Sequence, residues 1–146
     1  MFGCDGGWTD RALNYLQGSG AMSQVSYPYT ADENFRCKYD SSKVIARVSS
    51  VVTITDPLSA IKEGPIGVYV QALGPFLSYQ SGIFNGACSK TSYDHAVTAV
   101  GFGNENGVNY WILRDSLGST FGEDGHIRVQ ANGNCYITFV AAPIVA

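Results

Sequence analysis

The stretch HAVTAVGFGNENGVNYWILRD, residues 95–115, decides the fold of the second half of the chain. Its two ends, residues 95–102 and 108–114, are rich in the β-branched and aromatic residues that are typical of strands. Residues 103–107 between them are rich in turn-forming residues. The pattern predicts a β-hairpin, and with it a second half that is mostly antiparallel β-structure.

This hairpin is expected to bring His95 close to Asp115. If it pivots on Glu105, Phe102 faces Val108 and His95 lies directly opposite Asp115. Directly opposed residues of an antiparallel pair have Cβ atoms about 4.5–5.5 Å apart, so an imidazole N–H can reach a carboxylate. A slip of one residue would place the two side chains on opposite faces of the sheet.

Two interpretations of this pair are open. A histidine oriented by an acceptor is the base half of a nucleophile–base–orienter triad. Alternatively, the two residues form a cross-strand pair that satisfies polar groups at the end of a sheet. The other histidine, His126, has no comparable partner in the sequence, and we expect an ordinary surface or interface residue there.

The rest of the chain predicts a helix at the front, then a strand, a short helix and a further strand. These elements are expected at residues 8–17, 43–55, 57–63 and 66–72. Gly18 is expected to end the first helix, Asp56 to cap the second, and Gly64-Pro65 to end it. Residues 19–43 form an irregular connection.

Composition and charge describe a globular chain of 146 residues with 45% hydrophobic and 14% charged residues. The net charge of -3 and the absence of a Lys/Arg run argue against a nucleic-acid partner. No apolar stretch approaches the roughly 20 residues that span a bilayer. The first residues lack the basic and apolar regions of a signal peptide, so no compartment is predicted from them.

The four cysteines, Cys4, Cys37, Cys88 and Cys135, are too widely spaced for C-x-x-C metal pairs. No structural zinc site or other metal is therefore expected, and no residue pattern indicates a cofactor. Disulfides are the better interpretation, and spacing alone leaves all three pairings open.

Five segments then point to one family. They are Gly3-Cys4-Asp5-Gly6-Gly7-Trp8, Tyr27-Pro28-Tyr29, Asp94-His95-Ala96-Val97, Tyr110-Trp111-Ile112-Leu113-Arg114-Asp115-Ser116 and Gly122-Glu123-Asp124-Gly125-His126-Ile127-Arg128. In this order they resemble motifs of papain-like cysteine peptidases, family C1, of the papain and cathepsin L type. The resemblance covers the rear portion of the mature domain of that family.

The resemblance implies an α+β fold of two domains. Residues 1–44 would be a remnant of the helical domain that carries the Gly-Cys-x-Gly-Gly element, and residues 45–146 a β-rich, barrel-like domain. His95 would be the catalytic base, and Asp115 would occupy the position of the orienting Asn. The resemblance also implies that substrate is bound by Gly6, Gly7, Tyr69, Ala96 and Val140. It implies a disulfide between Cys88 and Cys135. Relatives are lysosomal, vacuolar or secreted.

The same resemblance shows what this sequence lacks. The nucleophile of the family lies in a C-G-[SA]-C-[WY] segment about 130–150 residues before the histidine, which here falls before residue 1. The Gln that stabilises the oxyanion belongs to that segment too. Since Cys4 and Cys37 correspond to cysteines whose partners lie there, we expect both to be unpaired or bridged to another chain. The chain by itself is not expected to cut peptides.

Several positions that are present depart from the family pattern. Asp115 replaces Asn, and its charge is expected to raise the imidazole pKa. Leu117 and Phe121 replace two Trp residues, Tyr69 stands where smaller residues are usual, and Tyr136 stands where Gly is common. Together these changes suggest a relaxed catalytic demand.

Two functions therefore compete. In the first, the chain is the rear part of a peptidase whose front half is supplied separately, with a peptide as substrate once the site is complete. In the second, it is a truncated pseudopeptidase that serves as a structural subunit or protein-binding module. Both imply a partner, which is either the missing N-terminal half or another subunit, because a missing half exposes apolar surface.

Overall fold

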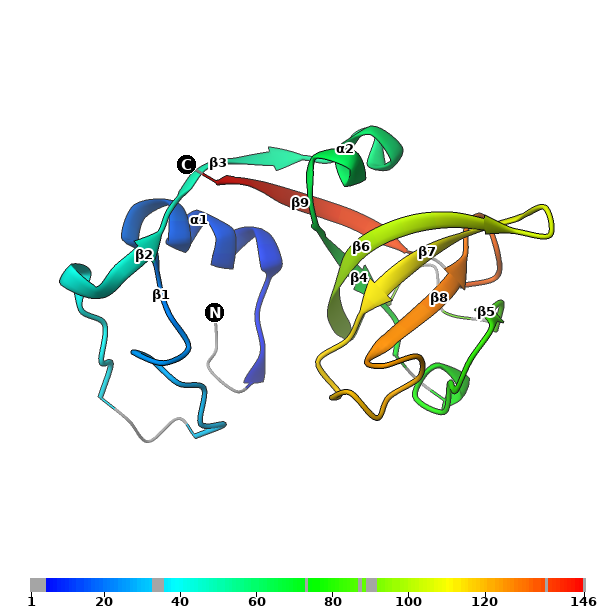
Figure 1. Ribbon diagram of the computed structural model, residues 1–146, viewed down its shortest axis with the longest axis horizontal. Coiled ribbons are helices and arrows are strands. Elements are labelled where there is room, and N and C mark those ends of the chain that lie inside the picture. Colours follow the sequence, from blue (N-terminus) through cyan, green and yellow to red (C-terminus); the bar gives the residue numbers. More distant parts are fainter. Residues whose placement is uncertain are drawn as a thin grey trace. The chain divides into compact units, whose positions relative to one another are not determined.

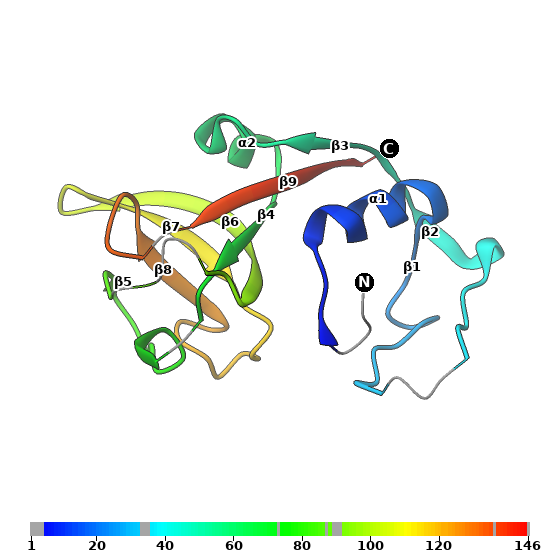
Figure 2. The same ribbon diagram turned by 180° about the vertical axis from the view of Figure 1, so that it is seen from behind.

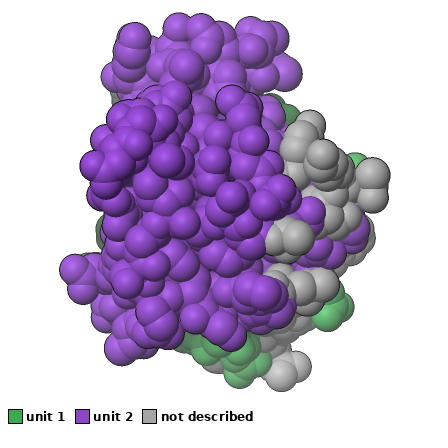
Figure 3. Space-filling view, turned by 90° about the vertical axis from the view of Figure 1, so that its right-hand side faces the viewer, with its two compact units in different colours: residues 1–52, 143–146 green, residues 53–142 purple. Residues whose placement is uncertain are grey.

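A computed structural model describes residues 5–32, 36–72, 74–86, 88, 92–135 and 137–145, the last five of these through their backbone. The chain divides into two compact units (Figure 3). Unit 1 contains residues 1–52 and 143–146, and unit 2 contains residues 53–142. The domain boundary expected after residue 44 concerns the family's two domains and stays a prediction.

Unit 1 contains the front helix and two short strands. Helix α1 spans Thr9–Ser19, strand β1 spans Ala21–Met22, and the 3-10 turn Ser41–Lys43 leads into β2, Val44–Ala46. The expectation that Gly18 ends the helix was wrong. Gly20 ends it instead, since its φ of 78° is a left-handed value and its N–H donates to the carbonyl of Leu16 at 2.8 Å.

The strand expected over residues 43–55 is divided. Its first part is β2, which pairs antiparallel with β1, and its second part is β3, Val48–Thr53. The short helix α2, Pro57–Glu63, is confirmed together with both of its ends. The side chain of Asp56 accepts the N–H groups of Leu58 and Ser59, and Gly64 follows the last helical residue.

Unit 2 is built on a curved sheet (Figures 1 and 2). The strands of the seven-stranded sheet follow the order β3-β9-β4-β6-β7-β8-β5. Their bounds are Ile66–Val70 for β4, Ile83–Phe84 for β5, His95–Glu105 for β6, Val108–Arg114 for β7, His126–Gln130 for β8 and Thr138–Val145 for β9, with a 3-10 turn at Gly74–Phe76. The β5–β8 pair is parallel, and the β4–β6, β4–β9, β6–β7 and β7–β8 pairs are antiparallel. The fold class is α+β, as expected.

The core of unit 2 lies against one face of this sheet. Ile66, Val68 and Val70 of β4 are fully buried, as are Leu113 of β7 and Phe76. Aromatic rings close the core, where Phe76 stacks on Phe121 at 6.2 Å and meets Phe84 edge-on at 5.9 Å. Ala60 and Ile61 of α2 pack against the same cluster.

The described part of the chain contains no helix long and apolar enough to cross a membrane.

The β6–β7 hairpin is confirmed, but the predicted register was wrong. Glu105 pairs with Val108, so the turn consists of Asn106 and Gly107 alone. Both have positive φ, 52° and 82°, which a type I′ turn requires. The tight turn changes every pairing along the hairpin. Phe102, for example, faces Trp111 and not Val108.

A β-bulge at Val100 then restores the face on which His95 lies. The pairing shifts between Ala99 and Gly101, so Thr98 faces Arg114 beyond the bulge. With this pairing, the residue opposite Asp115 is two positions from His95. Because side chains alternate with a period of two, His95 and Asp115 share a face as diagonal neighbours.

Candidate functional site

The site is centred on His95, the first residue of β6, and Asp115, the residue directly after β7. His95 Nε2 lies 3.1 Å from each carboxylate oxygen of Asp115. The side chain of Asp115 is 0% exposed and that of His95 is 24% exposed. The structure thus brings the two predicted site residues together at hydrogen-bonding distance.

This contact sets the roles of the two ring nitrogens. An ionised carboxylate only accepts hydrogen bonds, so Nε2 carries the hydrogen and donates it to Asp115. Nδ1 is then the nitrogen available for proton exchange with a reacting group. An imidazole oriented in this way is the arrangement that a general base requires.

Backbone groups hold the carboxylate in place. The Leu117 N–H donates to Asp115 Oδ1 at 3.1 Å, and the Asp115 N–H donates to the carbonyl of Gly125 at 2.9 Å. The loop that contains Gly125 is closed by an ion pair, in which Arg128 donates to both carboxylate oxygens of Glu123 at 2.8 Å. Asp115 therefore sits at the end of a fixed loop.

The two groups shift each other's pKa in opposite directions. The hydrogen bond to Asp115 raises the pKa of His95, while partial burial acts against this, and the charges of Asp115 and Asp94 add to the rise. Burial of Asp115 opposes its ionisation, but the hydrogen bond from His95 and the N–H groups of Leu117 and Ser116 outweigh it and hold its pKa below the usual range. The pair therefore favours imidazolium and carboxylate.

Asp94 also supports the site, although the spacing of residues in the sequence did not indicate a role for it. Its Oδ1 accepts the Ala72 N–H at 2.8 Å, and its own N–H donates to the carbonyl of Val70 at 3.3 Å. These bonds fix the chain directly before His95 against the end of β4. The one feature of the sequence that could have indicated this role is that Asp94 directly precedes His95.

Of the residues expected to bind substrate, three lie on neighbouring strands of unit 2. Tyr69 of β4 lies opposite Ala96 of β6 and opposite Thr138 of β9, and Val140 is two residues further along β9. Tyr69 is buried, and its ring lies 6.4 Å from that of Tyr93. The pocket role of these residues stays a prediction. Tyr69 and Ala96 pair next to Val70 and His95, so they face the other side of the sheet.

Gly6 and Gly7 belong to unit 1, where both are exposed and Gly6 has a φ of 96°. Gly6 thus has the conformation that favours glycine, and the role of both residues in a cleft stays a prediction.

The cysteines are partly assigned. Cys88 and Cys135 form the expected disulfide. Cys37 is free and exposed. Cys4 lies outside the described residues, as does Tyr136. Whether Cys4 and Cys37 are bridged to another chain stays a prediction.

The remaining predicted positions are ordinary surface and core residues. His126 Nδ1 lies 3.0 Å from the carbonyl of Asp124 and 3.3 Å from that of Glu123, so it donates to backbone. Leu117 is 49% exposed, whereas Phe121 is buried in the core. Among the described residues, no group of three or more His, Cys, Asp or Glu is placed to hold a metal ion.

Comparison with known proteins connects this geometry to a family. The family description "Papain family cysteine protease" matches residues 1–143. Cysteine proteinase COT44 of Brassica napus is 39% identical over 96% of this chain and 46% of its own length, and a cathepsin L-like proteinase of Fasciola hepatica is 37% identical over 99% and 47%. The chain therefore spans about half the length of the curated relatives it matches.

Solved structures agree with the sequence relatives. The bromelain protease of Ananas comosus, solved in complex with the E64 inhibitor, superposes with a TM-score of 0.84 and 34% identity over 97% of this chain and 71% of that chain. Procathepsin L2 from the Tenebrio molitor larval midgut gives 0.86 and 37% over 97% and 48%. The chain belongs to the papain family of cysteine proteases.

Proposed function

We propose that this chain carries the histidine half of a papain-like cysteine peptidase site, with His95 as general base and Asp115 as its orienting residue. The contact between His95 Nε2 and the fully shielded carboxylate of Asp115 supports the proposal. Since this contact occupies Nε2, Nδ1 is left to face a thiol.

The proposed reaction is acyl transfer to a cysteine. The thiol gives its proton to His95 Nδ1, and the thiolate attacks the carbonyl carbon of the scissile peptide bond. When that C–N bond breaks, the imidazolium returns the proton to the leaving amine. Water then attacks the thioester, giving a proton to His95, and the carboxylic acid leaves as the thiol is restored.

The thiol must come from outside these 146 residues. None of the four cysteines lies in a C-G-[SA]-C-[WY] segment, and Cys88 and Cys135 are joined in a disulfide. We therefore propose that the isolated chain is inactive. It becomes active when a front segment supplies the nucleophile and the oxyanion donor, and the substrate is then an extended peptide that contacts Gly6, Gly7, Tyr69, Ala96 and Val140.

The second candidate is a pseudopeptidase that acts as a structural subunit or protein-binding module. It is favoured by Leu117, which is half exposed and stands where the family pattern has a Trp. Tyr69 supports it as well, because its buried ring fills space on the face where a substrate side chain would bind.

Reconstitution distinguishes the two candidates. The purified chain is assayed with a fluorogenic peptide library and a biotinylated epoxide probe for active-site thiols, first alone and then with a separately produced front segment of the bromelain chain. We expect no hydrolysis and no site labelling from the chain alone. With the segment, we expect hydrolysis that is abolished by His95→Ala and retained in His126→Ala, which is the matched control.

The outcomes separate clearly. Hydrolysis by the chain alone that persists in His95→Ala would contradict the peptidase proposal. A complex that assembles but hydrolyses nothing, with a thiol that the probe does not label, would favour the pseudopeptidase.

A further inference from the structure

Unit 2 contains a pocket between helix α2 and strand β6 (Figure 1). Its volume is about 470 Å³, and its lining consists of Leu58, Ile61 and Lys62 of α2 with Gly101 and Phe102 of β6. Small-molecule sites typically measure about 300–1,000 Å³, so the size of this pocket suits a small ligand. None of the described residues that line it belongs to the His95 site.

The walls of this pocket are apolar and held in place by the core. Ile61 and Phe102 both pack against the buried cluster of unit 2. The Phe102 ring meets the ring of Trp111 edge-on at 4.8 Å. Leu58 precedes Ile61 by three residues, so it lies on the same side of α2, and it is 46% exposed. A ligand that covers this leucine removes apolar surface from water, which is favourable.

Lys62 gives the pocket a positive charge. Among the described residues, Lys62 takes part in no ion pair. The carboxylate of Asp56, at the other end of α2, already accepts the N–H groups of Leu58 and Ser59. Glu63 follows Lys62 in the sequence but does not line the pocket. A lysine combines an apolar stem with a charged end, so it extends an apolar wall and still presents an ammonium group to a ligand.

We propose that this pocket binds a small amphiphilic anion, which is an apolar chain or ring that ends in a carboxylate. The apolar body contacts Leu58, Ile61 and Phe102, and the carboxylate lies against Lys62. Charge complementarity selects this class of ligand, because an apolar alcohol gains the first contact alone and an apolar amine is repelled by the ammonium group. Binding of this kind goes beyond peptide hydrolysis and does not depend on it.

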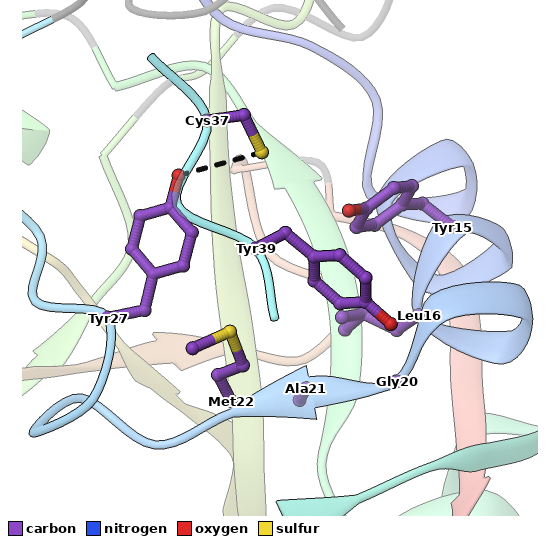
Figure 4. A pocket seen from close by; sticks show the side chains of 8 residues that line it. All are labelled: Tyr15, Leu16, Gly20, Ala21, Met22, Tyr27, Cys37 and Tyr39. Carbon is purple, nitrogen blue, oxygen red and sulfur yellow. Dashed lines mark hydrogen bonds between the residues drawn. The ribbon is translucent and has the colours of Figure 1, made fainter. Parts of the chain in front are cut away.

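A pocket of unit 1 provides an internal comparison (Figure 4). It has a volume of about 350 Å³ and is lined by Tyr15, Tyr27 and Tyr39 among other residues, none of them charged. An apolar ligand that binds there gains nothing from a charged head group. Gly20 lines this pocket and Gly101 lines the pocket of unit 2, so their amide signals report on the two pockets separately.

The test compares ligands of one chain length that differ in the head group: octanoate, octan-1-ol and octylammonium. Each is titrated near neutral pH into the full chain labelled with nitrogen-15, and amide shifts are followed by NMR. We expect saturable shifts at Gly101 and in α2 with octanoate. Octan-1-ol should bind about three- to fivefold more weakly, as the loss of an exposed ion pair predicts, and octylammonium more weakly still. The Gly20 signal should show no preference among the head groups.

Lys62→Gln removes the charge and keeps a residue of similar helix propensity. It should weaken octanoate binding about three- to fivefold and leave the affinity for octan-1-ol unchanged. Lys43→Gln is the matched control, because Lys43 is an exposed lysine that does not line the pocket, and both affinities should stay as in wild type. Leu58→Ala shortens the apolar wall, so it should weaken both ligands by about threefold or more. Lys62 and Leu58 are exposed, so neither change threatens the fold.

Several results would overturn the proposal. They are octanoate titrations that leave Gly101 unmoved, equal affinities for octanoate and octylammonium, and a Lys62→Gln variant that binds octanoate as tightly as wild type. Shifts at Gly101 that depend on protein concentration without ligand would also overturn it, because a second copy of the chain would then occupy the pocket. None of these measurements involves peptide hydrolysis, so failure of this site and failure of the proposed peptidase function are distinguishable.

Discussion

At the scale of single residues, Asp115 determines the charge of His95. The carboxylate is fully shielded and accepts from His95 Nε2, so the pair is most stable as imidazolium and carboxylate. An amide at the same position would accept the hydrogen bond without a charge.

Asp115→Asn is therefore expected to lower the pKa of His95. The measurement is a two-dimensional NMR titration of the histidine ring protons in both proteins. Asp124→Asn is the matched control, because it removes one carboxylate from an exposed turn of the same unit and keeps a residue that tolerates the φ of 51°. An unchanged His95 titration in Asp115→Asn would contradict the assigned cause.

The same pair gives stability a defined pH dependence. The raised pKa of His95 stabilises the folded state below about pH 6.5, and this contribution is lost as pH rises through the folded pKa. The lowered pKa of Asp115 stabilises it above about pH 3.9, and this is lost as pH falls through the folded pKa. Both contributions are present together between these values.

Wild type should therefore exceed Asp115→Asn in unfolding free energy most strongly near pH 5, by about 1 kcal/mol, and less at pH 9. Urea unfolding at the two pH values measures this difference. An equal difference at both would show that the ion pair contributes nothing.

At the scale of elements, the turn and the bulge of the β6–β7 hairpin place the site. The Asn106-Gly107 turn shifts the pairing by three residues from the expected register, and the bulge at Val100 shifts it back by one. An odd net shift would have placed His95 and Asp115 on opposite faces of the sheet. The net shift of two keeps them together.

Gly107→Ala should destabilise unit 2 by about 1 kcal/mol. A Cβ at Gly107 would meet nothing within 4 Å, so the cost comes from the φ of 82° alone. Asn106→Gly is the control, because glycine readily adopts the φ of 52° found at this position. Its free energy of unfolding should stay within about 0.5 kcal/mol of wild type. Chemical denaturation monitored by fluorescence of the buried Trp111 compares the three proteins. A neutral Gly107→Ala would argue against the type I′ turn.

At the scale of the whole molecule, the two units differ in what stabilises them. Unit 2 contains fifteen buried hydrophobic residues and the Cys88–Cys135 disulfide, which closes a loop of 47 residues. A crosslink of that span stabilises a fold by about 4 kcal/mol in the chain-entropy account. Unit 1 has neither feature among its described residues.

Limited proteolysis of the isolated chain should therefore remove unit 1 first and leave a resistant fragment within residues 53–142. Unit 1 opens at low free-energy cost because few apolar contacts oppose opening. Broad-specificity protease digestion followed by intact-mass analysis identifies the fragment. Survival of α1 for as long as β6–β8 would mean that unit 1 is stable by itself.

Local sequence determined the elements that depend on local chemistry. Asp56 and Gly64 bound α2 as predicted, since a side-chain cap and a flexible residue act within one turn. Ordered motifs determined the family and the Cys88–Cys135 pairing. The prediction that Gly18 ends α1 was wrong because either of two nearby glycines could end the helix, and the helix ends at Gly20.

Only the tertiary structure decided how the site is assembled. The sequence indicated that His95 and Asp115 belong together, but it placed them directly opposite each other, whereas they meet diagonally through an unpredicted bulge. A bulge is set by how Ala99, Phe102 and Trp111 all reach the core, which is a non-local packing condition. The burial of Asp115 and the number of buried residues in unit 1 are likewise set by which distant segments of the chain come into contact. No local sequence pattern encodes such contacts.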